Sequence, residues 1–168
     1  MKNKSVKLMC LTGIFVAVVF VFTAYLHIPT YNGYVHIGDG IIFLAACLLP
    51  WQYAVFVGAG GALLADCLTG YAIWAPGSVI IKATTALLFS SKCKKIIEKR
   101  NLSALLPAIV ICAGGYYLYE VLITGSFIAS LEGVPGSLTQ SIASCILFVV
   151  VGRAFDKMNL KQKLYGGK

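Results

Sequence analysis

The sequence predicts an all-α integral membrane protein, a bundle of six transmembrane helices with both termini in the cytoplasm. Three observations lead to this fold class. Of the 168 residues, 59% are hydrophobic and only 12% are charged, about half the charged share of a soluble domain. Mean hydropathy is +0.85, and long apolar runs alternate with basic segments. Because a soluble protein of this length could not bury so much apolar surface, lipid must cover it.

The basic residues set the predicted orientation. The net charge is +8, and 13 of the 14 basic residues fall in three segments next to apolar runs. These residues are Lys2, Lys4 and Lys7; Lys92, Lys94, Lys95, Lys99 and Arg100; and Arg153, Lys157, Lys161, Lys163 and Lys168. The positive-inside rule places all three segments on the cytoplasmic face. Since hardly any aromatic residue is interleaved with these charges, we expect no nucleic-acid partner.

Three apolar runs predict transmembrane helices at about 8–27, 104–126 and 136–153. The apolar segment between them, Gly38 to Ser90, must cross the membrane an odd number of times, because it begins outside and ends at cytoplasmic lysines. One crossing would leave most of it without a bilayer. Three crossings fit, with breaks at Pro50-Trp51-Gln52 and between Gly70 and Gly77.

The middle segment therefore contributes helices at about 39–49, 52–69 and 77–90. Outer loops are expected at 28–38, 70–76 and 127–135, and residues 1–168 form a single membrane domain. The six cysteines contain no C-x-x-C pair and read as small buried hydrophobic residues. We expect no disulfide, no metal site, no cofactor and no catalytic residues.

Four ionisable residues interrupt or border the apolar helices, namely Asp39, Asp66, Lys82 and Glu120. Each costs about 2.5–3.5 kcal/mol at the bilayer centre, so such residues usually have a function or a partner. The predicted topology places all four in the outer half of the membrane. A structural alternative is that Asp66 pairs with Lys82 and that Asp39 caps its helix.

Further polar and aromatic residues are expected at the same depth. Together with the four ionisable residues they form the predicted substrate-binding set: Asn32, Tyr34, His36, Asp39, Asp66, Tyr71, Trp74, Lys82, Tyr116 and Glu120. Rings for stacking and a few hydrogen-bonding groups suit a small, flat, polar molecule. The alternative is an interfacial belt of aromatic residues.

The rest of the chain indicates a binding device that depends on partners. The cytoplasmic half of the predicted bundle holds no ionisable residue, and the sequence has no Walker motif, so the chain cannot hydrolyse ATP. Gly13 and Ala17 form a small-xxx-small pair on the first helix, which lets another helix approach closely. A similar face on the third helix has Gly58, Gly61, Ala62 and Ala65. Internal packing is the alternative for either face.

Two stretches of the sequence resemble a known family. The first is Val35-His36-Ile37-Gly38-Asp39-Gly40, followed by Ile41–Ala46. The second is Gly61-Ala62-Leu63-Leu64-Ala65-Asp66, continuing through Gly70-Tyr71 and Ala75-Pro76 to Lys82. Both resemble the substrate-binding subunits, or S-components, of energy-coupling factor (ECF) vitamin transporters, in their riboflavin/hydroxymethylpyrimidine/pyridoxine-type branch. The resemblance is strongest over residues 35–90.

The resemblance implies a six-helix bundle in the bacterial plasma membrane that captures a vitamin at its outer side. It also implies docking on a transmembrane coupling subunit (T-component), which works with two cytoplasmic ATPase subunits, and toppling of the bundle to release its cargo. In the family an Ala-x-x-x-Ala pattern on the first helix mediates docking, and Gly13 and Ala17 match its positions.

For the cargo we expect a vitamin or precursor of pyridine or pyrimidine type, such as vitamin B6 or hydroxymethylpyrimidine. Riboflavin and a stand-alone secondary carrier are the alternatives. A membrane-embedded enzyme using Glu120, Asp66 and His36 is disfavoured, because the sequence lacks any catalytic motif that would support it.

Overall fold

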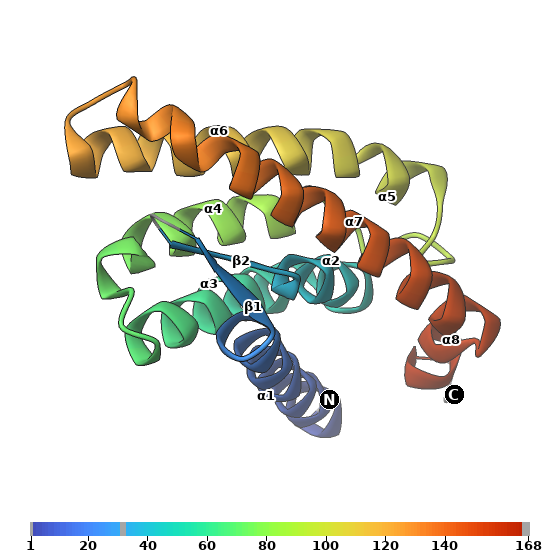
Figure 1. Ribbon diagram of the computed structural model, residues 1–168. Helices are drawn as coiled ribbons and strands as arrows, with labels where there is room; N and C mark the ends of the chain where they lie inside the picture. The colour runs from blue at the N-terminus through green and yellow to red at the C-terminus, as the bar shows by residue number, and fades with distance from the viewer. Residues whose placement is uncertain (1, 31–32, 166–168) are drawn as a thin grey trace.

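The structure, a computed structural model, describes residues 2–30 and 33–165. Helices make up most of it (Figure 1). The longer helices are α1 (Lys2–Ala24), α2 (Gly38–Leu48), α3 (Trp51–Leu68), α4 (Ala75–Leu87), α6 (Leu105–Thr124) and α7 (Val134–Lys157). Short helical segments are η1 (Ala72–Trp74), α5 (Lys99–Ser103), η2 (Ala129–Gly133) and α8 (Leu160–Tyr165). The six longer helices coincide in position with the six predicted ones, and the chain is an all-α membrane protein in its main architecture.

Helix length separates these six helices into two groups. Four segments of the described chain are long and apolar enough to cross a membrane: Ser5–Ala24, Trp51–Leu68, Lys99–Thr124 and Ala129–Lys157. α2 and the segment Ala72–Leu87 are apolar but shorter. With 11 residues, α2 extends only about 16 Å, half the hydrocarbon thickness. The count of six crossings and the location of the termini therefore stay predictions.

α2 occupies the centre of the bundle, which explains why a short helix suffices there. All of its residues are buried, because α1, α3, α4 and α7 pack around it. It contributes Phe43 to an apolar core. The ring centroids of Phe43 and Phe89 lie 4.6 Å apart there, and those of Phe89 and Phe148 lie 5.4 Å apart. α3 and α4 approach closely because Gly58 has no side chain: a Cβ there would lie 2.8 Å from the Lys82 carbonyl oxygen.

A β-hairpin, which the sequence did not predict, lies in the connection expected at 28–38. β1 (His27–Thr30) and β2 (Gly33–His36) are antiparallel, with His27 opposite His36 and Ile28 opposite Val35. The hairpin connects α1 to α2. It lies beside the start of α7, which contacts β2.

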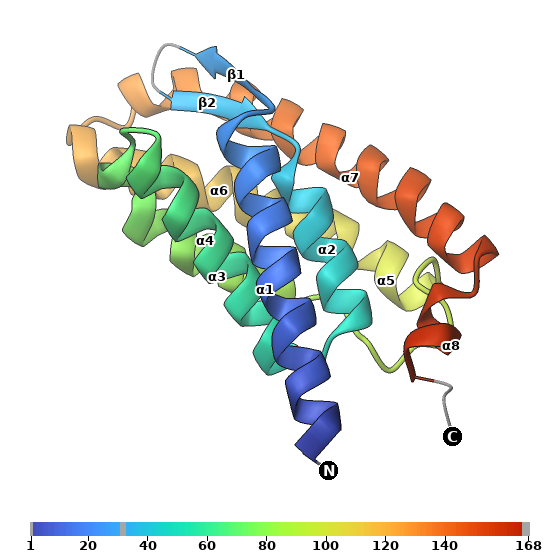
Figure 2. The same cartoon turned by 90° about the horizontal axis from the view of Figure 1, so that it is seen from below.

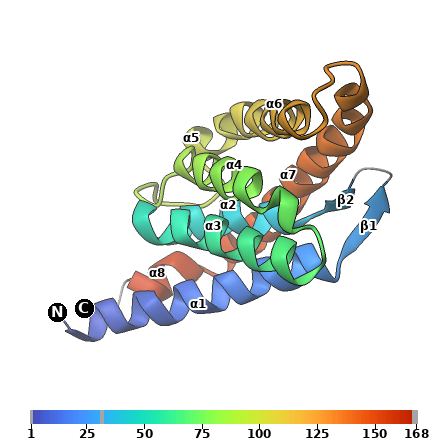
Figure 3. The same ribbon diagram turned by 90° about the vertical axis from the view of Figure 1, so that its left-hand side faces the viewer.

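The elements gather at two opposite ends of the bundle (Figures 2 and 3). The hairpin, η1 and η2 lie at one end, called here the hairpin end. The beginning of α1, α5 and α8 lie at the other, called the terminal end. There the Lys7 ammonium donates a 2.5 Å hydrogen bond to the Leu164 carbonyl oxygen. The Asp156 carboxylate accepts hydrogen bonds from the backbone N–H groups of Ile96 and Ile97, each at 2.8 Å, and so ties the loop after α4 to α7.

Candidate functional site

A cavity lies at the hairpin end of the bundle. Its empty volume is about 810 Å³, including the open mouth. Side chains and backbone from β2, α3, η1, α4, α6, η2 and α7 surround it. Six predicted site residues line it: Tyr34, His36, Asp66, Trp74, Tyr116 and Glu120.

The remaining predicted site residues have other positions. Asp39 and Lys82 are buried and do not line the cavity, and Tyr71 packs against the ring of Tyr34 without belonging to the lining. Asn32 lies outside the described residues. The depth argument from the sequence thus identified residues from four separate elements that do come together in space.

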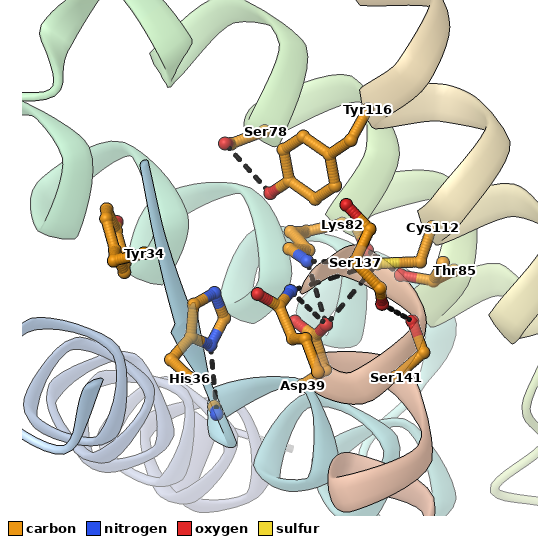
Figure 4. Close-up of polar contacts among 12 residues, drawn as sticks. Tyr34, His36, Asp39, Ser78, Lys82, Thr85, Cys112, Tyr116, Ser137 and Ser141 are labelled. Atoms are coloured by element: carbon orange, nitrogen blue, oxygen red, sulfur yellow. Dashed lines mark hydrogen bonds and ion pairs between the residues drawn. The ribbon is translucent and has the colours of Figure 1, made fainter. Parts of the chain in front are cut away.

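An ion pair connects α2 to α4 next to the cavity. The Lys82 ammonium donates a 2.8 Å hydrogen bond to Asp39 Oδ2, and their side chains are 2% and 3% exposed (Figure 4). The same carboxylate oxygen accepts a 3.1 Å hydrogen bond from the Gln140 amide, and Cys112 Sγ lies 3.6 Å from it. The alternative that Asp66 is the partner of Lys82 is therefore wrong. Asp39 does not cap α2 either, because no side-chain hydrogen bond caps that helix.

Tyr116 contacts this ion pair and also lines the cavity. Lys82 Nζ lies 4.7 Å from the centroid of the Tyr116 ring, which is within the range of a cation–π interaction. The Tyr116 hydroxyl is 3.0 Å from Ser78 Oγ on α4. A molecule in the cavity therefore meets the aromatic ring of Tyr116, while the ammonium group of Lys82 bonds to Asp39 behind it.

The opposite wall is built on Tyr34 of the hairpin. Its hydroxyl donates a 2.5 Å hydrogen bond to Asp66 Oδ1 on α3. Burial, together with the nearby Asp66 carboxylate, raises the pKa of Tyr34, so the phenol stays protonated and remains a donor. The rings of Tyr71 and His27 pack against Tyr34 at centroid distances of 4.7 and 5.0 Å. Tyr71 thus positions a cavity residue.

His36 is neutral at physiological pH. Burial lowers its pKa to about 4, although Asp39 opposes this shift. Its Nδ1 accepts a 3.1 Å hydrogen bond from the Gly38 N–H. In a neutral imidazole the other nitrogen then carries the proton. Because His36 lines the cavity, it offers a fixed ring with an N–H donor.

Sequence reasoning missed about half of the lining. The residues it did not single out are Val35, Ser78, Glu132, Gly133, Gly136, Ser137 and Gln140. Several of them belong to α7, where Ser137, Gln140, Ser141 and Ser144 follow the i, i+3, i+4, i+7 spacing of one helix face. This polar stripe in an apolar helix could have predicted that α7 lines the cavity. Gly133 makes room for the carboxylate of Glu120, since a Cβ on Gly133 would clash with Glu120 Oε2.

Within residues 2–30 and 33–165, no group of three or more His, Cys, Asp or Glu residues is arranged to hold a metal ion. The cavity lining combines the rings of Tyr34, Trp74 and Tyr116 with several hydrogen-bonding groups and carboxylates. This arrangement is suited to holding a polar ring compound.

Comparison with known families agrees with this arrangement. Residues 3–157 match the family described as ECF-type riboflavin transporter, S component. No curated protein matches the chain. S components are transporter subunits and not a class of enzyme. The match spans nearly the whole chain, including all six longer helices and the cavity, and it agrees with the resemblance seen in residues 35–90: the chain belongs to the S components of ECF-type transporters.

Proposed function

We propose that this S component captures a small water-soluble vitamin or precursor of pyridine or pyrimidine type, such as vitamin B6 or hydroxymethylpyrimidine, for ATP-driven uptake. The observation that carries the proposal is the cavity at the hairpin end. Tyr34, Trp74 and Tyr116 provide ring surfaces, and Asp66, His36 and Glu120 provide polar groups around them. Such a lining holds a flat ring by stacking and orients it by hydrogen bonds.

The proposed site residues have two roles. Tyr34, His36, Asp66, Trp74, Tyr116 and Glu120 contact the ligand. Asp39, Lys82 and Tyr71 position these contact residues, through the Lys82–Tyr116 contact and the packing of Tyr71 on Tyr34. Asn32, which lies outside the described residues, is kept as a proposed contact.

The proposed topology places the hairpin end outside the cell and both termini inside. The three basic segments belong to the terminal end and to the loop after α4, which supports this orientation through the positive-inside rule. The six longer helices then each run from one face of the membrane to the other. α2 crosses as a short buried helix sheltered from lipid by its neighbours.

We further propose that α1 docks on the T-component through Gly13 and Ala17. Both residues are exposed, and nothing lies within 4 Å of where a Gly13 Cβ would be. The small residues of α3 differ, because a Cβ on Gly61 would lie 2.5 Å from a Val19 methyl carbon on α1 and one on Gly58 would meet α4. The α3 face therefore packs internally, and α1 offers the open one.

Release of the cargo requires the coupling subunits in this proposal. Beyond the cavity the bundle interior becomes apolar and contains the packed Phe43, Phe89 and Phe148 rings. No polar path is expected through this core. We therefore propose that the whole subunit moves relative to the membrane, driven by ATP hydrolysis in the partner ATPases, which favours a transporter subunit over a stand-alone secondary carrier.

Riboflavin is the second candidate ligand. The description of the matched family names it, and its larger ring system would also stack on the Tyr and Trp side chains of the cavity. A direct test is mass spectrometry of small molecules that co-purify with the detergent-solubilised chain, followed by thermal shifts with a panel of B vitamins. A stoichiometric pyridine or pyrimidine compound supports the proposal. Stoichiometric riboflavin selects the second candidate, and an empty protein without any thermal shift contradicts both.

A further inference from the structure

The charged side chains that line the cavity are acidic and not basic. Among the described residues, its lining contains three carboxylate side chains, Asp66, Glu120 and Glu132, and no lysine or arginine. His36 does not offset them, since its buried imidazole is neutral at physiological pH. The site thus presents negative charge and hydrogen-bond acceptors to its ligand.

Lys82 does not supply the missing positive charge. Its ammonium is bonded to Asp39 at 2.8 Å, and the two charges neutralise each other outside the lining. The Tyr116 ring, which does line the cavity, lies beside the ammonium. An anionic ligand such as a phosphate ester would therefore face carboxylates without a compensating cation.

Asp66 adds a second, independent observation. The residue is 4% exposed and lines the cavity. Its Oδ1 accepts the hydrogen bond from Tyr34, but its Oδ2 is buried and has no hydrogen-bond partner among the described residues. The neighbouring Ser78 hydroxyl can donate to the Asp66 carboxyl group, and its Oγ also lies 3.0 Å from the Tyr116 hydroxyl, where either oxygen can be the donor. A buried carboxylate oxygen that lacks a donor is costly, and a donor from the ligand would remove that cost.

We propose that the ligand is an amino-substituted or protonated nitrogen heterocycle whose N–H group donates to Asp66 Oδ2, and that the site excludes its phosphorylated, anionic forms. The inference rests on the proposed function and narrows its ligand class. Glu120 and Glu132 contribute negative potential on the opposite side of the cavity, where η2 meets α6. The rings of Tyr34, Trp74 and Tyr116 then hold the heterocycle by stacking and, for a cationic ring, by cation–π attraction.

The test compares ligands that differ in one donor group. Dissociation constants of the purified chain in detergent are measured for 4-amino-5-hydroxymethyl-2-methylpyrimidine and its 4-methyl analogue, which has no donor at that position. They are also measured for pyridoxamine, 4-deoxypyridoxine and pyridoxamine 5′-phosphate. The amino form of the preferred ring should bind about 10- to 100-fold more tightly than the methyl form, the factor expected for one charge-assisted hydrogen bond. The phosphate ester should bind more weakly than its parent amine.

Variants assign the preference to Asp66. Asp66→Asn keeps an oxygen for Tyr34 but removes the charge, and it should reduce the preference for the amino form to less than about threefold. Glu98→Gln removes one exposed carboxylate at the terminal end and should leave the preference unchanged. If Asp66→Asn fails to fold, Glu120→Gln replaces it and should also weaken binding of the amine.

The outcomes separate this inference from the proposed function. If a ring binds equally well in its amino and methyl forms, the inference is wrong and the pyridine or pyrimidine proposal stands. If Asp66→Asn folds and keeps the full preference, Asp66 is not the acceptor and the inference is also wrong. If neither ring binds in any form while riboflavin does, the proposed ligand class itself is wrong.

Discussion

The buried ion pair between Lys82 and Asp39 illustrates how a single residue carries both a cost and a function. Lysine is expensive inside a membrane unless it is paired, and here its partner comes from a helix 43 positions earlier in the sequence. Gln140 and Cys112 also contact Asp39, so α2, α4, α6 and α7 meet at this carboxylate. The pair therefore fixes the relative positions of four helices below the ligand cavity.

Removing one partner of this ion pair should destabilise the protein more than removing both. Lys82→Met leaves the Asp39 charge buried without its partner, and we expect the free energy of unfolding to fall by about 3–5 kcal/mol. The double variant Asp39→Asn with Lys82→Met removes both charges and should recover at least half of that loss. Unfolding in detergent, followed by circular dichroism, measures both values. A double variant that loses as much stability as Lys82→Met, or more, would contradict the expectation that the unpaired Asp39 charge causes the loss.

His36 should make the stability of the protein depend on pH. Its pKa is about 4 in the folded protein against 6.5 when unperturbed, so between these values the unfolded chain binds more protons than the folded one. Stability is therefore complete above about pH 6.5 and decreases as the pH falls towards 4, by at most about 1.4 kcal/mol per pH unit. Asp39 opposes this shift, whereas Lys82 and His27 act in the same direction as burial.

The measurement is the unfolding temperature of the purified chain between pH 7 and 5, compared with that of His36→Gln. Glutamine keeps a side-chain acceptor for the Gly38 N–H but does not titrate. The variant should therefore show a flatter pH dependence than the wild-type chain. Identical slopes in the two proteins would mean that His36 does not cause the dependence.

At the scale of elements, the sequence predicted where the helices lie but not how long each helix is. Hydropathy and the breaks at Pro50 and Gly70 located six helices correctly, because apolar runs of this kind have few alternatives in a membrane. Parity required three helices between residues 38 and 90, yet it could not reveal that α2 has 11 residues and is wholly buried. Helix length there depends on packing by four neighbours, which no local pattern records.

The candidate site, too, could be predicted from the sequence only in part. Ionisable residues in apolar helices are rare enough to be recognised from sequence, and two of the four line the cavity while the other two pair beside it. The choice of Asp39 over Asp66 as the partner of Lys82 depends on helix rotation and could not be read from depth alone. The hairpin was missed because its strands have four residues each, too short for a clear alternating pattern.

The free face of α1 leads to a prediction about docking. Gly13→Leu adds bulk where the bundle has open space, so ligand binding and stability should stay within about twofold and 0.5 kcal/mol of the wild-type values. Uptake by cells that express the complete transporter should fall at least tenfold, because the helix of the partner can no longer approach closely. Binding to the purified chain and uptake of the same labelled ligand are measured in parallel.

Gly114 on α6 is a matched control, since nothing lies within 4 Å of a Cβ at that position either. Gly114→Leu should leave both binding and uptake unchanged, because α6 is not the proposed docking helix. If Gly13→Leu abolishes ligand binding as well, Gly13 packs internally. If both variants transport normally, α1 does not dock through this face.

At the scale of the whole molecule, polarity is divided between the two ends of the bundle. The hairpin end holds the cavity and its carboxylates, whereas the described parts of the three basic segments, at the start of α1, after α4 and from the end of α7 onwards, meet at the terminal end. An apolar core with stacked phenylalanine rings separates the two ends. This distribution suits a subunit that binds its ligand at one membrane face and never opens a pore to the other.

The orientation of this asymmetric bundle can be tested by labelling cysteines in intact cells. In a chain whose six cysteines are replaced by alanine, Ile28→Cys places a thiol on the hairpin, where the native side chain is 71% exposed. Lys99→Cys places one at the exposed start of α5, at the other end. A membrane-impermeant maleimide should label the first variant in intact cells and the second only after permeabilisation, because basic segments are retained in the cytoplasm. The opposite labelling pattern would mean that the cavity faces the cytoplasm, and capture of an external vitamin would then be impossible.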